Sequence, residues 1–184
     1  LAENAEKDIR DILEDEASPA IKSAVLYRSF LDTDAIEQAG ITPIKSDLDA
    51  VDKAPSKAAL TTVLGTLNPA GGPDLIGFMV YPNPGDPDHN ITHVEQAGLG
   101  LPDEAYYRED RYEEVRKAYV DMVAKLLKLS GYADDETAGH AQAERFLDTE
   151  TRIAGHHWDV VSTRDEDKTY NPTDYGTLRQ VLRD

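Results

Sequence analysis

The stretch that decides the fold is residues 112–129, Tyr-Glu-Glu-Val-Arg-Lys-Ala-Tyr-Val-Asp-Met-Val-Ala-Lys-Leu-Leu-Lys-Leu. Its large apolar residues recur three or four positions apart, the period of an α-helix with one buried face. Gly131 follows and is expected to end the helix. The predicted buried stripe consists of Val115, Tyr119, Met122, Leu126 and Leu129.

Helical patterns also fill most of the chain on both sides of this segment. Candidate caps and first-turn prolines, such as Ser18-Pro19 and Pro55-Ser56, set several of the predicted boundaries. In the helix that starts near Ser18, we expect Ile21, Val25 and Phe30 to face inward. The predicted helices cover residues 2–17, 19–31, 32–40, 43–51, 57–67, 103–107, 135–158 and 174–182.

One segment departs from the helical pattern. Residues 75–81 are short, apolar and β-prone, and residues 90–96 resemble a second strand. Residues 82–88 between them, Pro-Asn-Pro-Gly-Asp-Pro-Asp, favour turns, so we predict a β-hairpin with a long loop. No repeat or linker divides the rest of the chain. We therefore expect one mainly α, multi-helix domain over residues 1–184, with one small β-hairpin.

Composition excludes several functional classes. The 184 residues include 36 acidic and 19 basic side chains, a formal charge of −17, and contain no basic block for a nucleic acid or an anionic membrane. The absence of cysteine excludes disulfides and thiolate zinc sites. No apolar run approaches the length of a membrane span. Because the chain starts at Leu1 in a helical pattern, we expect a fragment, and its location, cytoplasmic or secreted, is left open.

The histidines do not form a convincing metal-binding pattern. His89 and His93 are four residues apart, but they fall on a predicted strand, and Asn90 stands where a metallopeptidase helix needs Glu. His156 and His157 are adjacent, so a helix would turn them apart; His157 is expected in the core beside Trp158. An independent metalloenzyme built on His89 and His93 is therefore the least favoured alternative.

Glu150 lies close to the inward side of the predicted helix over residues 135–158. A carboxylate in that position should be paired, and Arg28, Arg152 or Arg164 could supply the partner. We interpret Glu150 as part of a structural ion pair rather than as a catalytic acid.

A longer motif carries a resemblance to a known family. The run Gly98-Leu-Gly-Leu-Pro-Asp-Glu-Ala-Tyr-Tyr107 resembles the Gly-Leu-Gly-Leu-Pro-x-x-x-Tyr-Tyr region of the M13 zinc metallopeptidases, which include neprilysin, endothelin-converting enzyme and bacterial oligopeptidase O. Residues 26–40, 150–158 and 167–172 resemble further family segments in the same order. The resemblance implies structural roles for the motif residues Gly98, Gly100, Leu101, Pro102, Tyr106, Tyr107, Glu150, Tyr170 and Asn171.

The resemblance implies a non-catalytic, N-terminal lid portion of a neprilysin-like zinc metalloendopeptidase that hydrolyses peptides. In the family, the zinc-binding His-Glu-x-x-His helix lies far downstream, and nothing here matches it. Zinc is thus expected only in the full-length parent, and no catalytic, cofactor or metal residue is assigned to this chain. The expected partners are the catalytic domain of the same polypeptide and the parent's peptide substrates. The alternative is a stand-alone acidic helical binding module related to the lid.

Overall fold

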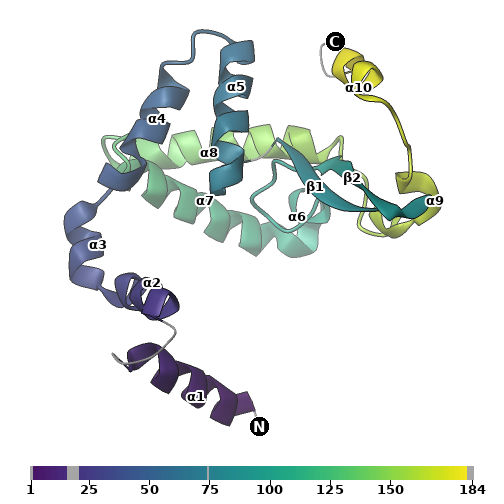
Figure 1. Cartoon of the computed structure of the whole chain (residues 1–184). Helices are drawn as coiled ribbons and strands as arrows, with labels where there is room; N and C mark the ends of the chain where they lie inside the picture. The colour runs from purple at the N-terminus through teal and green to yellow at the C-terminus, as the bar shows by residue number, and fades with distance from the viewer. Residues whose placement is uncertain (1, 16–20, 74, 182–184) are drawn as a thin grey trace. The chain divides into compact units, whose positions relative to one another are not determined.

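The structure is a computed structural model that describes residues 2–15, 21–73 and 75–181 (Figure 1). These residues form ten α-helices and one two-stranded antiparallel sheet. The predicted mainly α fold with one β-hairpin is therefore confirmed. Internal contacts divide the chain into two units, Leu1–Lys53 and Ala54–Asp184, which are described separately. The single domain over residues 1–184 stays a prediction.

The first unit is a succession of short helices. Asp32 caps one of them, because its side chain accepts a hydrogen bond from the Ala35 N–H at 3.0 Å, and Gly40, at φ 51°, ends the same helix as predicted. The boundary at Ser18-Pro19 lies outside the described residues. The helices are α1 (Ala2–Glu14), α2 (Ile21–Leu31), α3 (Thr33–Ala39), the 3-10 turn η1 (Thr42–Ile44) and α4 (Lys45–Asp52).

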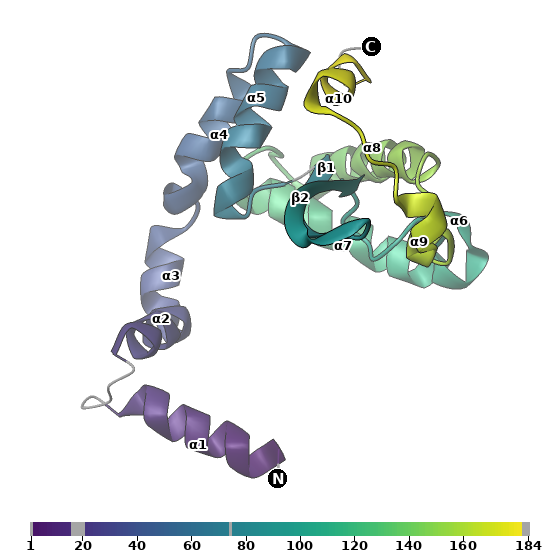
Figure 2. The same cartoon turned by 45° about the vertical axis from the view of Figure 1, so that its right-hand side comes forward.

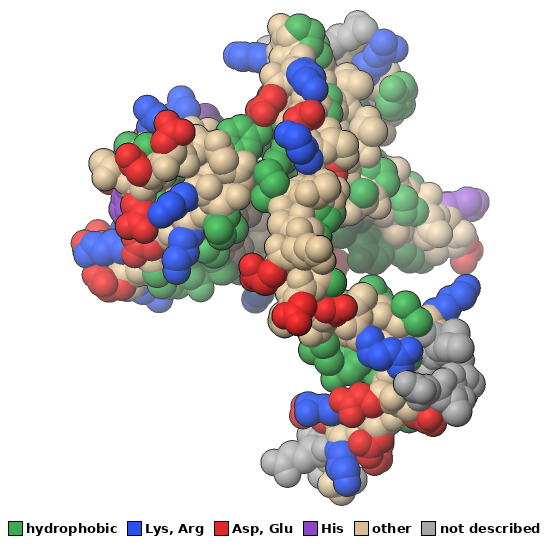
Figure 3. Space-filling view, turned by 90° about the vertical axis from the view of Figure 1, so that its left-hand side faces the viewer, with side chains coloured by type: hydrophobic (Ala, Val, Ile, Leu, Met, Phe, Trp, Pro, Cys, Tyr) green, Lys and Arg blue, Asp and Glu red, His purple; other side chains and the backbone are tan. Residues whose placement is uncertain are grey.

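The first unit buries little of its apolar surface. Among its described side chains, Ala24 is buried, whereas Val25 and Phe30, which were expected to face inward, are exposed. That prediction was wrong, because helical periodicity identifies an apolar face but not whether a neighbouring element covers it. The side chain of Ile21 lies outside the described part. Figure 3 shows hydrophobic side chains at the surface between acidic and basic ones.

The second unit is built on two long helices that lie side by side, α7 (Glu113–Leu129) and α8 (Glu136–Ala154) (Figures 1 and 2). The same unit contains several shorter elements. They are α5 (Lys57–Leu67), η2 (Asn68–Ala70), β1 (Ile76–Asn83), β2 (Asp86–Gln96), α6 (Ala105–Arg108), η3 (Asp110–Tyr112), η4 (Ser162–Arg164), α9 (Glu166–Thr169) and α10 (Tyr175–Val181).

Small residues bring α7 and α8 together. A Cβ on Gly139 would lie 2.9 Å from the Ala124 carbonyl oxygen, so glycine is needed at this close approach. Gly131, at φ 80°, ends α7 as predicted. The buried cluster between the two helices consists of Val120, Val123, Ala124 and Ala143, with Tyr119, Leu127 and Leu147 packed against it.

The face of α7 that meets α8 differs from the predicted stripe. Tyr119 packs against the core as expected, but Met122 and Leu126 are exposed, as are Val115 and Leu129 at the two ends of the stripe. The helix carries apolar residues on two sides, and the side with Val120, Val123 and Ala124 is the one that α8 covers. The other side contains a shallow hollow lined by Ala118, Asp121, Met122 and Lys125.

Two segments of the second unit differ from the predictions. Asp135 caps α8 as expected, but the helix ends at Ala154 rather than at Trp158. His157 is consequently only half-buried, with its ring nitrogen 3.1 Å from the Ala97 carbonyl oxygen, and Trp158 is exposed. The predicted loop over residues 163–169 contains η4 and α9 instead, because Asp165 supplies an N-cap to the Lys168 N–H.

The hairpin is tighter than the sequence indicates. The strands continue to Asn83 and start again at Asp86, so a two-residue turn replaces the long loop. The register is irregular between Pro82 and Asn83, which accommodates the extra residues of β2. Prolines fit here because both strands of a two-stranded sheet are edge strands, where a missing N–H breaks no central ladder.

Candidate functional site

Glu150, on α8, is the one buried charged side chain among those the structure describes, with 5% of its surface exposed. One carboxylate oxygen, Oε1, accepts a hydrogen bond from the backbone N–H of Gly100 at 2.9 Å. The other, Oε2, accepts one from the Tyr107 hydroxyl at 3.0 Å. That hydroxyl in turn accepts a bond from the N–H of Leu101 at 3.0 Å. Glu150 thus holds the loop before α6 directly at the Gly100 amide and, through the Tyr107 hydroxyl, at the Leu101 amide.

Two tyrosine hydroxyls surround the carboxylate. Burial raises the pKa of Tyr107 to about 12, and the hydrogen bond and negative charge of Glu150 also favour its protonated form. The pKa of Tyr119 is raised for the same two reasons, burial first and the hydrogen bond to Glu150 second. Both phenols therefore keep their protons at neutral pH. The buried negative charge is stabilised by neutral donors.

The two glycines of the motif have different structural roles. A Cβ on Gly100 would collide with the hydroxyl of Tyr119 and come within 3.2 Å of Glu150 Oε1, so this position has no room for a side chain. Gly98 adopts φ 89°, a left-handed conformation that favours glycine. Leu101 is buried with Tyr107 and Ala154 in a second apolar cluster. The loop therefore packs over the carboxylate with its backbone in direct contact.

The prediction that an arginine pairs with Glu150 was wrong. Arg152 pairs instead with Asp148, at 3.7 Å on the exposed surface of α8. Residues two apart on a helix point to different sides, so Arg152 could not share the buried side of Glu150. The sequence signal that could have found the true partners is the glycine-rich loop, whose free backbone N–H groups can bind a carboxylate.

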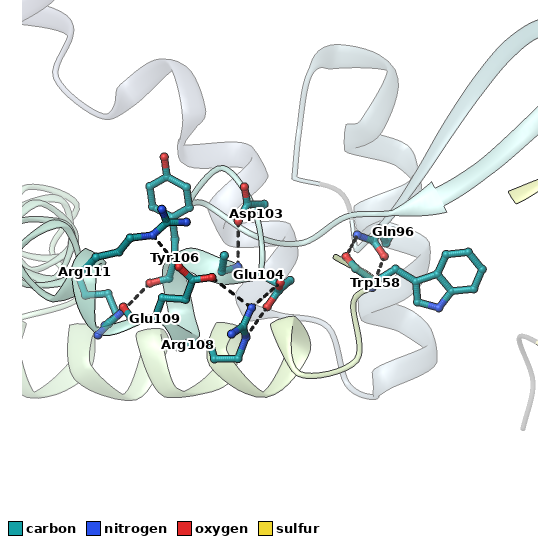
Figure 4. Close-up of polar contacts among 10 residues, drawn as sticks. Gln96, Asp103, Glu104, Tyr106, Arg108, Glu109, Arg111 and Trp158 are labelled. Carbon is teal, nitrogen blue, oxygen red and sulfur yellow. Dashed lines mark hydrogen bonds and ion pairs between the residues drawn. The ribbon is translucent and has the colours of Figure 1, made fainter. Parts of the chain in front are cut away.

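Tyr106 stabilises the turn between α6 and α7 rather than the carboxylate. Its ring stacks on Tyr112 with centroids 3.9 Å apart, and Arg111 lies over the Tyr112 ring at 4.6 Å. Arg116 donates to the carbonyl oxygens of Tyr106 and Glu109 at 2.7 and 2.9 Å. Figure 4 shows the polar contacts along this turn. Pro102, also a motif residue, is exposed.

The remaining motif residues, Tyr170 and Asn171, make other contacts. The Tyr170 hydroxyl donates to the side-chain oxygen of Asn83 at 2.8 Å, next to the hairpin turn. Gly85 leaves room for the Tyr170 ring, since a Cβ there would collide with it. Asn171 donates to the Lys168 carbonyl oxygen at 2.6 Å, at the end of α9. The structure therefore brings Gly100, Leu101, Tyr107 and Glu150 together and places Tyr170 and Asn171 with different partners.

The histidines of the hairpin bind protein groups. His89 contacts Asp86 at 2.8 Å, and His93 lies 3.4 Å from the Pro82 carbonyl oxygen. Within residues 2–15, 21–73 and 75–181, no three His, Asp or Glu side chains are grouped closely enough to hold a metal ion. Among the helices that the structure describes, none is long and apolar enough to cross a membrane.

The sequence comparison agrees with the motif. Residues 1–183 match the N-terminal model of peptidase family M13, so the chain belongs to that family and corresponds to the N-terminal domain of its metallopeptidases. It is 28% identical to neprilysin of Oryctolagus cuniculus over 189 residues, covering 91% of this chain and 24% of the relative. It is 35% identical to endothelin-converting enzyme 1 of Cavia porcellus over 95 residues, covering 51% of this chain and 12% of the relative.

A solved structure shows the same fold. The zinc metalloprotease ZMP1 of Mycobacterium tuberculosis, in its open state, superposes with a TM-score of 0.87 at 34% identity. The match covers 97% of this chain and 28% of the relative. The inhibitor complex of the same protein gives the same TM-score and coverage. The chain therefore spans between 12% and 28% of the length of these relatives.

Proposed function

We propose that residues 1–184 form a non-catalytic lid portion of a zinc metalloendopeptidase that hydrolyses peptides. The match over residues 1–183 and the likeness to a zinc metalloprotease support this assignment. The lid would shape the access of peptides to an active site formed by the catalytic domain of the same polypeptide. Zinc bound in that domain would polarise the scissile carbonyl and activate water.

The hydrogen bonding of Glu150 is the observation that supports a non-catalytic role. A buried carboxylate is the kind of group from which enzymes make a general acid or base. Here both oxygens are engaged by Gly100 and Tyr107, and each bond holds part of the chain's own loop. A carboxylate used in this way supports a scaffold, in which the loop and the α7–α8 pair are fixed to one another.

Fluorogenic peptides test the proposal. We expect no hydrolysis by the purified chain, with or without added zinc, and chelator-sensitive hydrolysis by the full-length parent. Activity of the chain itself that a chelator abolishes, in a preparation free of other proteases, would refute the non-catalytic role. The parent's reading frame provides a second check. A stop codon before any His-Glu-x-x-His sequence would favour the stand-alone binding module.

A further inference from the structure

We propose that one face of the β1–β2 hairpin, together with Trp158, is the surface on which the part of the parent polypeptide outside residues 1–184 docks. This inference rests on the proposed function and specifies which surface of the lid portion meets the rest of the enzyme. The surface, called the hairpin face below, consists of Phe78, Val80, Val94 and Trp158.

The strand register places three of these side chains on one side of the sheet. Phe78 lies directly opposite Val94, and the neighbouring same-side pair is Val80 with Thr92. Directly opposed residues share a face, and residues two apart along a strand return to it. All three apolar side chains are exposed. The hairpin therefore presents a row of large apolar groups that no described part of the chain covers.

Gln96 fixes Trp158 at the base of the same face. Gln96 is two residues from Val94, so its side chain leaves the sheet on that side. Its amide donates to the Trp158 carbonyl oxygen at 3.1 Å and accepts from the Trp158 N–H at 2.8 Å. The backbone of Trp158 is thus held at two points, while the residue itself stays 48% exposed. Figure 4 shows the indole ring pointing away from Gln96.

Two physical arguments indicate that this face has a partner. A two-stranded hairpin is marginally stable in water unless one face packs against another element. A tryptophan whose backbone is fixed loses little conformational freedom on binding, and tryptophan is enriched among the residues that dominate interfaces. The combination of Trp158 with Phe78 and Val80 is therefore suited to an apolar, well-packed contact.

The rest of the same polypeptide is the occupant that the observations favour. The matched region makes up only 28% of the ZMP1 chain, so most of that relative lies outside the part resembled here. A covalently linked domain meets the face at a high effective concentration. A second copy is disfavoured, because two chains of charge −17 repel each other.

Site-specific photo-crosslinking in the full-length parent tests the inference. Phe78→p-benzoylphenylalanine replaces one aromatic side chain by another on the hairpin face. Tyr81→p-benzoylphenylalanine is the matched control: Tyr81 is also aromatic, is 55% exposed against 49% for Phe78, and points to the opposite side of the sheet. After irradiation, crosslinked peptides are identified by mass spectrometry.

We expect the Phe78 variant to crosslink to peptides from outside residues 1–184, and the Tyr81 variant to do so much less. Crosslinks confined to residues 1–184, crosslinks between two copies, crosslinks only to an added peptide substrate, or equal yields from both variants would each overturn the inference. A parent that lacks zinc-dependent hydrolysis would refute the proposed function instead. An active parent without the expected crosslinks would refute only the assignment of this surface.

Discussion

Tyr107 donates its hydroxyl hydrogen to the carboxylate of Glu150, 43 residues away in the sequence, and the bond of 3.0 Å is buried. The same hydroxyl accepts the N–H of Leu101, so one oxygen atom connects a helix side chain to the loop backbone. Two different kinds of substitution, at the carboxylate and at the loop, should therefore produce the same loss of order.

Removing the carboxylate is expected to destabilise the chain strongly. Glu150→Ala leaves the Gly100 N–H and the Tyr107 hydroxyl without their acceptor, and should lower the free energy of unfolding by roughly 3 kcal/mol. Glu150→Gln keeps one acceptor oxygen and should cost less. Urea unfolding followed by circular dichroism measures both. Glu144→Ala, at an exposed position of the same helix, is the control and should change stability by no more than about 0.5 kcal/mol.

Adding a methyl group to the loop should also destabilise the chain. In Gly100→Ala, the new Cβ collides with the Tyr119 hydroxyl, and relieving this overlap is expected to cost about 1–3 kcal/mol. Gly65→Ala, within α5, meets no atom within 4 Å and should instead stabilise by about 0.5–1 kcal/mol, because alanine favours helix.

A double-mutant cycle identifies the cause of the Gly100→Ala effect. If the collision with the hydroxyl is responsible, Tyr119→Phe should recover part of the stability lost in Gly100→Ala. If the two changes in the free energy of unfolding were strictly additive, the added methyl group would not act through the Tyr119 hydroxyl.

The chain should lose stability in alkaline solution through Tyr107. The pKa of Tyr107 is about 12 in the folded chain and about 10 when unfolded. Its contribution to the free energy of unfolding is therefore fully present below pH 10 and is lost as the pH rises through 12. The loss should reach roughly 2 kcal/mol at pH 12. Denaturant unfolding at several pH values between 9 and 12 should show a shallower decline for Tyr107→Phe. The same change at the exposed Tyr175 should leave the decline as it is in the unmodified chain.

Tyr170 is expected to stabilise the hairpin turn locally. Tyr170→Phe removes the hydrogen bond to Asn83, worth about 1 kcal/mol. Amide hydrogen exchange should become faster in residues 83–90 and stay unchanged in α7 and α8. Exchange that accelerates equally in all elements would contradict a local role.

Local signals in the sequence predicted several element boundaries correctly. The helix predicted over residues 57–67 has those bounds, and its cap is Ser56, which accepts the Ala59 N–H at 3.2 Å. Helix caps depend on residues three or four apart, so they can be recognised without knowledge of the fold. The mainly α class follows from many such segments.

Contacts between distant segments could not be predicted in the same way. The clamp between Gln96 and Trp158 joins residues 62 positions apart, and neither side chain carries a pattern that indicates the other. The partner of Glu150 was missed because a search for opposite charge overlooks backbone N–H groups. Likewise, periodicity could not decide which apolar side of α7 meets α8, because both sides have helical spacing.

The hydrogen bond between Gly100 and Glu150 has a consequence for the order in which the chain folds. It closes a segment of 50 residues, whereas α7 and α8 are neighbours in the sequence and can pair across a short connection. Closing a long segment costs more chain entropy than closing a short one. We therefore expect the helix pair to assemble first and the loop to dock afterwards onto a carboxylate that is already in place.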